Sequence, residues 1–215
     1  MSELAEISGK QPRPKRRRQE DRSRVMRQRL IEATMECLLE VGYSDLSISK
    51  IVERAGVSRG AHLHHFESKA ALIAAATEAL YDRMAERTAL TLGAPLASGR
   101  LTVRVIIERL WSGVILSPEA QIYLELLMAS RTDPVLAERI AHLTPKLTRI
   151  YIELGQQFLQ IKPGSPLGVA QLVQLTRAIL RGMLLEVPAL GGDARELPEI
   201  EMWIALLEQH LEAKN

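Results

Sequence analysis

The chain has 215 residues, of which 47% are hydrophobic, 25% are charged and only 4% are aromatic, and its formal net charge is +2 at pH 7. This length suits one or two small domains with a sizeable core. The single cysteine, Cys37, excludes an intramolecular disulfide, and no apolar run approaches membrane-spanning length. Strand-forming runs are scarce while Ala, Leu, Glu and Arg are plentiful, so we expect an all-α, cytoplasmic protein without membrane attachment.

Residues 1–21 predict a disordered basic arm. They mix Ser, Gly, Pro and Gln with Lys and Arg, without hydrophobic periodicity. Positive charge is densest between Arg13 and Arg29, and Lys15 to Arg18 are four basic residues in a row. Such a run is either a solvated tail or an electrostatic arm in which Arg17 and Arg18 contact phosphates or the minor groove.

A first helix is expected over residues 22–41, ended by Gly42. Residues 47–66 then predict two short helices joined by a tight turn. Ser47 caps the first of these, and Gly56 falls where a helix ends in the left-handed region. Ile48, Ile51, Val52 and Ala55 follow at the spacing of one helical face.

The second short helix should begin at Ser58, with Leu63 and Phe66 packing inward and its polar side chains outward. A helix-turn-helix places such a helix in the DNA major groove. Lys69 lies just beyond it, beside the exposed amides of the next helix, where it can anchor a phosphate. The candidate DNA-contacting residues are Arg17, Arg18, Ser47, Lys50, Ser58, Arg59, Gly60, His62, His64, His65 and Lys69.

The histidines of this segment can also be considered as metal ligands. His62 and His65 stand at i and i+3, but no Asp, Glu or Cys with ligand spacing joins them. A structural zinc site requires four ligands, so we expect no metal and no cofactor. His65 has a further alternative role, in which it packs inside the helix-turn-helix segment.

The order and spacing of these residues resemble the signature of the tetracycline-repressor (TetR) family of bacterial regulators. The resemblance covers residues 24–84, and the usual tyrosine of the signature, a phosphate-contacting group in relatives, is replaced by Leu63, so His62 or His64 is expected to take over that contact. The matching positions are Gly42-Tyr43, Ser47, Ala55-Gly56-Val57-Ser58, Gly60-Ala61, His65-Phe66, Ser68-Lys69 and Leu72.

Beyond the motif, capping residues and prolines divide the chain into further helices. Ser68 begins a long helix that Gly93 and Pro95 stop, and Ser117-Pro118 and Asp133-Pro134 each begin another. We expect helices over residues 134–161, kinked at Pro145, over 166–187 and over 197–213. The predicted domains are a helix-turn-helix head over 22–84 and a helical body over 85–215.

The body contains candidates for an effector site, which the family resemblance also implies. These side chains are expected to surround a cavity between helices, with Arg177 or Glu125 as its polar group, although each also suits an ordinary helical core. The apolar lining favours a lipophilic effector. The candidate lining residues are Trp111, Tyr123, Leu127, Phe158, Arg177 and Met183.

The last two helices carry apolar stripes wider than one packing contact needs. One face can pack on its own subunit and the other on a partner, forming a four-helix interface. The alternative is a buried helix within a monomer. The resemblance implies a homodimer through these helices, and the candidate interface residues are Leu172, Ile179, Trp203 and Leu207.

These features predict a homodimeric DNA-binding transcriptional regulator, a repressor released from a palindromic operator by a small-molecule effector. One alternative is a non-specific DNA-binding protein without an effector. Another is an α-helical enzyme that uses the cavity of the body. No Gly-x-Ser-x-Gly elbow, no cysteine-histidine pair and no paired carboxylates support catalysis, so we expect no enzyme activity.

Overall fold

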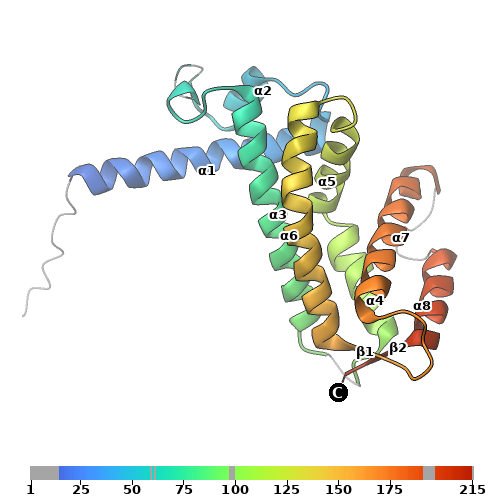
Figure 1. The fold of residues 1–215 in the computed structure, drawn as a ribbon. Coiled ribbons are helices and arrows are strands. Elements are labelled where there is room, and N and C mark those ends of the chain that lie inside the picture. The colour runs from blue at the N-terminus through green and yellow to red at the C-terminus, as the bar shows by residue number, and fades with distance from the viewer. Residues whose placement is uncertain (1–14, 59, 61, 97–99, 191–196, 215) are drawn as a thin grey trace, which may run out of the picture.

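The computed structural model describes residues 15–58, 60, 62–96, 100–190 and 197–214. Within them the chain forms eight α-helices, a 3₁₀ turn, a π-helical turn and two three-residue strands, so the fold is all-α as the composition predicts (Figure 1). The elements in chain order are α1 Lys15–Val41, α2 Ile48–Arg54, η1 His62–His64, α3 Lys69–Gly93, α4 Val103–Leu110, the π-helical turn η2 Trp111–Ile115, α5 Pro118–Ala129, α6 Pro134–Phe158, β1 Leu159–Ile161, α7 Val169–Leu190, α8 Pro198–His210 and β2 Leu211–Ala213.

Side-chain caps begin the helices where the sequence predicts them. Ser68 accepts a hydrogen bond from the backbone N–H of Ala71 at the start of α3, and Asp133 accepts one from Leu136 at the start of α6. Ser117 does the same for α5. Each cap satisfies an N–H that has no partner inside the helix. Helix α6 continues through Pro145 without a break.

Helix α1 begins earlier than expected, at Lys15. The prediction of a disordered arm over residues 1–21 is therefore wrong for residues 15–21, and residues 1–14 lie outside the described part of the chain. The basic run consists of Lys and Arg, which have high helix propensity, so it extends the helix that follows. An ion pair between Asp21 and Arg24, 3.3 Å apart, joins the last residue of this extension to the helix that follows.

Two expected helix ends are strands instead. Helix α6 ends at Phe158 rather than residue 161, and α8 ends at His210 rather than residue 213. The three residues after each helix pair antiparallel, with Leu159 opposite Ala213 and Ile161 opposite Leu211. Both segments alternate apolar and polar residues, and three residues are too few for periodicity to separate a strand from a helix end.

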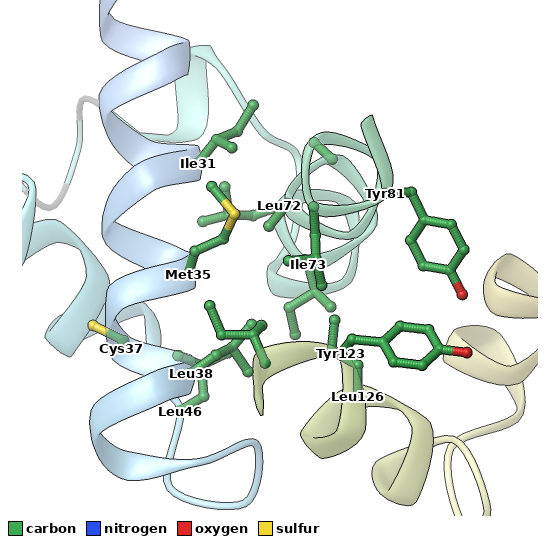
Figure 2. Close-up of a cluster of buried hydrophobic side chains, with 14 of the residues drawn as sticks. Ile31, Met35, Cys37, Leu38, Leu46, Leu72, Ile73, Tyr81, Tyr123 and Leu126 are labelled. Carbon is green, nitrogen blue, oxygen red and sulfur yellow. The ribbon is translucent and has the colours of Figure 1, made fainter. Parts of the chain in front are cut away.

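The upper part of the molecule has one hydrophobic core that joins the N-terminal helices to α5 and α6. Figure 2 shows Leu38 of α1 and Leu72 of α3 in this core, with Leu126 of α5 nearby. The rings of Tyr81 and Tyr123 pack edge to face, with centroids 5.7 Å apart. We call this cluster the upper core, and it connects the predicted helix-turn-helix head directly to the body.

A second hydrophobic core, the lower core, lies among α4, η2, α7, α8 and the two strands. Helix α3 contributes Leu72 to the upper core and Leu92 to the lower one, so a single unbroken helix spans both. The predicted domain boundary after residue 84 falls inside this helix and stays a prediction.

Candidate nucleic-acid interface and effector cavity

The first half of the helix-turn-helix is built by local hydrogen bonds. Ser47 Oγ accepts from the backbone N–H of Lys50 at 3.3 Å, which caps α2. Gly56 follows with φ +62°, a conformation that side chains with a Cβ rarely adopt. Arg29 of α1 donates to the carbonyl oxygen of Ala55 at 2.6 Å, which fixes the turn against α1. The prediction of a Ser47 cap and a Gly56 turn is confirmed.

The second half differs from the expected α-helix. Only His62–His64 are helical among the described residues of this segment, and they form one 3₁₀ turn. The expectation that Leu63 packs inward beside Phe66 is wrong, because Leu63 is 61% exposed while Phe66 is buried. A short 3₁₀ turn followed by an irregular residue does not keep those two side chains on one face.

The predicted DNA-contacting residues lie in different settings. Ser58, Gly60, His64 and Lys50 are exposed, and Ser47 is half-buried. Arg59 lies outside the described residues. For Arg17, Arg18 and His62, only the backbone is described, in α1 and η1.

His65 is tied to α1 rather than free at the surface. Its Nδ1 lies 3.4 Å from Ser23 Oγ, and its carbonyl oxygen accepts from Arg27 at 3.0 Å. The Arg27 guanidinium also stands 4.2 Å from the centroid of the Phe66 ring. These contacts agree with the alternative role of His65 in packing the head.

Lys69 begins α3 and is half-buried, with its Nζ 5.6 Å from the centroid of the Tyr43 ring. A cation in the first turn opposes the helix dipole, so this position does not favour helix stability. The ammonium therefore lies near the Tyr43 ring, on the residue that begins α3, and the first backbone N–H groups of a helix have no partner within the helix.

Tyr43 also connects the head to the body. Its backbone N–H donates to Glu125 Oε1 of α5 at 2.6 Å, and its hydroxyl donates to Asp133 before α6. This corrects one expectation, since Glu125 binds the head and does not line the cavity. The hydrogen bond from Tyr43 is the main cause that lowers the pKa of Asp133, and burial raises the pKa of Tyr43.

A cavity of about 110 Å³ lies between the helices of the body, lined mostly by aliphatic side chains of α3 to α8. Of the predicted lining residues, Tyr123, Phe158 and Arg177 line it. Trp111, Leu127 and Met183 do not, because Trp111 and Met183 pack in the lower core and Leu127 packs against the upper core. The polar members of the lining are Thr88, Tyr123, Tyr151, Thr176, Arg177 and Arg181.

Sequence reasoning missed Arg181 and Tyr151 in this lining. Arg181 stands one helical turn after Arg177 on α7, so the i, i+4 spacing was a usable signal. Tyr151 belongs to the middle of α6, where its apolar ring resembles any core position. Burial raises the pKa of the Tyr151 hydroxyl to about 12, so it is a neutral hydrogen-bonding group at pH 7.

Two of the four predicted dimer residues lie in the lower core of their own chain. Leu172 and Leu207 are buried, and Trp203 donates its indole N–H to Thr176 Oγ1 at 3.2 Å, while Ile179 is half-buried. The assignment of Leu172 and Leu207 to an interface is therefore wrong, because helical periodicity does not tell which apolar face is covered by the same chain. Among the described side chains of α7 and α8, the exposed large hydrophobic ones are Leu175, Leu185, Met202 and Leu206.

No group of three or more His, Cys, Asp or Glu residues in the described part of the chain is arranged to hold a metal ion. None of its helices is long and apolar enough to cross a membrane.

The structure defines a helix-turn-helix protein, because a capped helix and a glycine turn precede an exposed polar second element. This head is joined to a helical body with a cavity for a small ligand.

Comparison with known proteins agrees with this class of protein. The family model described as "Bacterial regulatory proteins, tetR family" matches residues 30–76. The chain is 36% identical over 142 residues to the HTH-type transcriptional regulator CymR of Pseudomonas putida, which covers 65% of this chain and 68% of that one.

A longer match is the HTH-type transcriptional regulator BetI of Pseudomonas fluorescens, 32% identical over 176 residues, or 79% of this chain and 84% of that one. A transcriptional regulator of Saccharomonospora viridis, solved in complex with choline, has the same fold with a TM-score of 0.61 at 17% identity, over 88% of this chain and 98% of that one. The chain belongs to the TetR family and is a DNA-binding transcriptional regulator.

Proposed function

We propose that the chain is a repressor that binds a palindromic operator as a homodimer and releases it when a small molecule occupies the cavity of the body. The observation that carries this proposal is that two helices line the cavity and also hold the head. Helix α3 supplies Met84 and Thr88 to the lining and begins at Lys69 in the head. Helix α5 supplies Tyr123 to the lining and Glu125 to the contact with Tyr43.

DNA recognition in this proposal uses polar side chains in and around η1. Arg59 and His64 read base edges, and Lys50 and Lys69 bind phosphates. The exposure of Lys50 and His64 supports these roles. His65 keeps its place against α1. Leu63 stands where the family signature has tyrosine, and its exposed side chain offers an apolar contact to a thymine methyl group.

The proposed dimer forms through the exposed faces of α7 and α8. Leu175 and Leu185 of α7 and Met202 and Leu206 of α8 are exposed large hydrophobic side chains. Gly182 and Ala178 lie on the same exposed side of α7, where small residues let a second helix approach closely. A two-fold axis through this surface gives the four-helix interface of two subunits.

Release follows from the coupling between the cavity and the head. A ligand that displaces Tyr123 acts on α5, and Glu125 on the same helix transmits the change to the joint between α1 and α2. The same ligand acts on α3 at Met84 and Thr88, and so on the position of Lys69. Effector binding then lowers the affinity for the operator, and operator binding lowers the affinity for the effector by the same factor.

Selection of bound fragments from random DNA by the full chain tests this function. The proposal expects one enriched palindrome, and transcription of a reporter through that site should fall when the chain is present. A single salt-dependent affinity for all sequences would instead favour the non-specific DNA-binding alternative. A rise in reporter transcription would make the chain an activator.

A further inference from the structure

The cavity contains two arginines that have no acidic partner among the residues that the structure describes. Arg177 and Arg181 of α7 both line it, one helical turn apart. Neither forms an ion pair with a carboxylate in the described part of the chain, whereas other half-buried arginines such as Arg87 do. Two positive charges at this spacing repel each other, so the arrangement has an electrostatic cost in the empty protein.

Neutral groups hold the two guanidiniums in position. Arg177 donates to Thr148 Oγ1 at 2.6 Å, and Arg181 donates to the Tyr123 hydroxyl at 2.8 Å and to the backbone oxygen of Arg177 at 3.0 Å. Nη2 of each arginine has no hydrogen-bond partner among these contacts, and the buried Nε of Arg177 has none either. Donors therefore remain for a further acceptor.

Burial makes this positive charge costly. Desolvation, followed by repulsion from Arg181, lowers the pKa of Arg177 from its ordinary value, although an arginine stays protonated at pH 7. A buried charge is normally compensated by an opposite charge. In this cavity the protein supplies hydroxyl groups and no carboxylate.

Most of the remaining lining is aliphatic and limits the size of an occupant. It includes Ile107 of α4, Val114 of η2, and Leu147, Leu154 and Leu180 of α6 and α7. A cavity of about 150 Å³ holds a benzene molecule, and the space of about 110 Å³ is smaller, so the apolar body is limited to a short alkyl chain or at most one small ring.

We propose that the effector is a small amphipathic anion, a monocarboxylate whose charged end binds Arg177 and Arg181 and whose apolar body fills the aliphatic part of the cavity. The guanidinium fork matches a carboxylate in geometry and charge. A quaternary ammonium is disfavoured, because Arg181 already stands 5.7 Å from the centroid of the Tyr123 ring that would receive such a cation. This inference rests on the proposed role of the cavity as the effector site.

Calorimetric titration of the full chain tests the ligand class directly, without DNA. The probes are benzoate, phenylacetate and hexanoate, each compared with its neutral analogue, namely benzyl alcohol, 2-phenylethanol and hexanol, and with choline. At least one carboxylate should bind about 10- to 100-fold more tightly than its neutral analogue. Arg177→Gln and Arg181→Gln should each remove most of that preference.

A matched control is Arg149→Gln, which removes one positive charge from the exposed surface of α6 and should keep the preference. Thermal melting and binding to the selected operator fragment establish that each variant is folded. Equal binding of the neutral analogues, tighter binding of choline, no binding of any carboxylate at millimolar concentration, or an unchanged preference in both arginine variants would each overturn the inference.

These measurements distinguish a failure of the proposed ligand class from a failure of the proposed function. A chain that binds its operator selectively but prefers a neutral or cationic probe is still a regulator, and only the ligand class is wrong. A chain that binds carboxylates but keeps its operator at saturating ligand retains the ligand class and loses the release mechanism.

Discussion

Tyr43 connects the head to the body through two hydrogen bonds. It donates its backbone N–H to Glu125 and its hydroxyl to Asp133. The preceding Gly42 has φ +73°, and a Cβ there would lie 2.9 Å from Glu125 Oε1. Gly42 and Tyr43 therefore form a polar joint between the loop after α1, helix α5 and the residue that caps α6.

This joint predicts a pH dependence of stability. The pKa of Asp133 is lowered in the folded chain by the hydrogen bonds from Tyr43 and from the backbone N–H of Leu136. A carboxyl group with a lowered pKa stabilises the fold above its unfolded pKa, and that contribution is lost as the pH falls through the folded pKa. The melting temperature of the wild type should fall more between about pH 5 and pH 2 than that of Tyr43→Phe.

Thermal melts of the two proteins over this range give the comparison, and the difference between them cancels the other titrating groups. Parallel curves would mean that the Tyr43 hydroxyl contributes nothing through Asp133.

A substitution of Lys69 tests its proposed contact with a DNA phosphate. Lys69→Ala should weaken binding to every DNA sequence and reduce the slope of log affinity against log salt by about one unit, because one counterion fewer is released. Fluorescence anisotropy at several salt concentrations measures this slope. Lys146→Ala is the control, since Lys146 is an exposed lysine on α6 and should leave the slope unchanged. A slope unaltered in Lys69→Ala removes this residue from the interface.

At the scale of elements, the basic N-terminus of α1 carries the second electrostatic prediction. Replacing the four basic residues Lys15 to Arg18 by glutamine keeps a helix-compatible sequence while it removes four positive charges. Thermal stability should stay nearly constant, and DNA affinity should fall with a flatter salt dependence. Binding isotherms that overlay those of the wild type at all salt concentrations would make this end of α1 a solvated extension.

The sequence predicts those parts of the fold that depend on local chemistry. Ser47, Ser68 and Gly56 act within a few residues of themselves, so their caps and turn are confirmed. Leu63 was misassigned because its exposure depends on whether the segment forms a full helix. Leu159 to Ile161 form a strand only because a segment 52 residues later pairs with them, and such pairing has no local signal.

The candidate sites follow the same division. Residue type predicts the side chains of the cavity, yet only three of the six predicted residues line it. The rotation of each helix about its axis decides whether an apolar side chain faces the cavity or the neighbouring core. Leu172 and Leu207 belong to a broad apolar stripe, and the covered half of that stripe is decided by how α7 and α8 pack on the body. Glu125 was expected in the cavity because nothing in the sequence shows that Tyr43, 82 residues earlier, is its partner.

At the scale of the whole molecule, the dimer prediction uses the exposed face instead of the buried stripe. Leu175→Glu together with Leu206→Glu places unpaired carboxylates on the proposed interface and should give monomers in sedimentation. Monomers lose the linkage of two half-sites, so operator affinity should fall by roughly 100- to 10,000-fold. Val135→Glu, an exposed apolar residue on α6, is the matched control and should stay dimeric.

Two results would contradict this part of the account. A wild-type chain that sediments as a monomer at micromolar concentration excludes the dimer itself. A folded double variant that remains dimeric excludes this face and leaves the dimer in place. Leu207→Glu is unsuitable for the test, because Leu207 is buried in the lower core and its change would destabilise the fold.

An operator-specific regulator distinguishes one palindromic DNA sequence from all others. The most direct measurement is the ratio of its affinities, at one fixed salt concentration, for the selected palindrome and for a scrambled sequence of equal length and composition. We expect the affinity for the palindrome to be about 1,000 times higher or more, and most of this sequence preference to be lost when one half-site is scrambled. A ratio near one would contradict it.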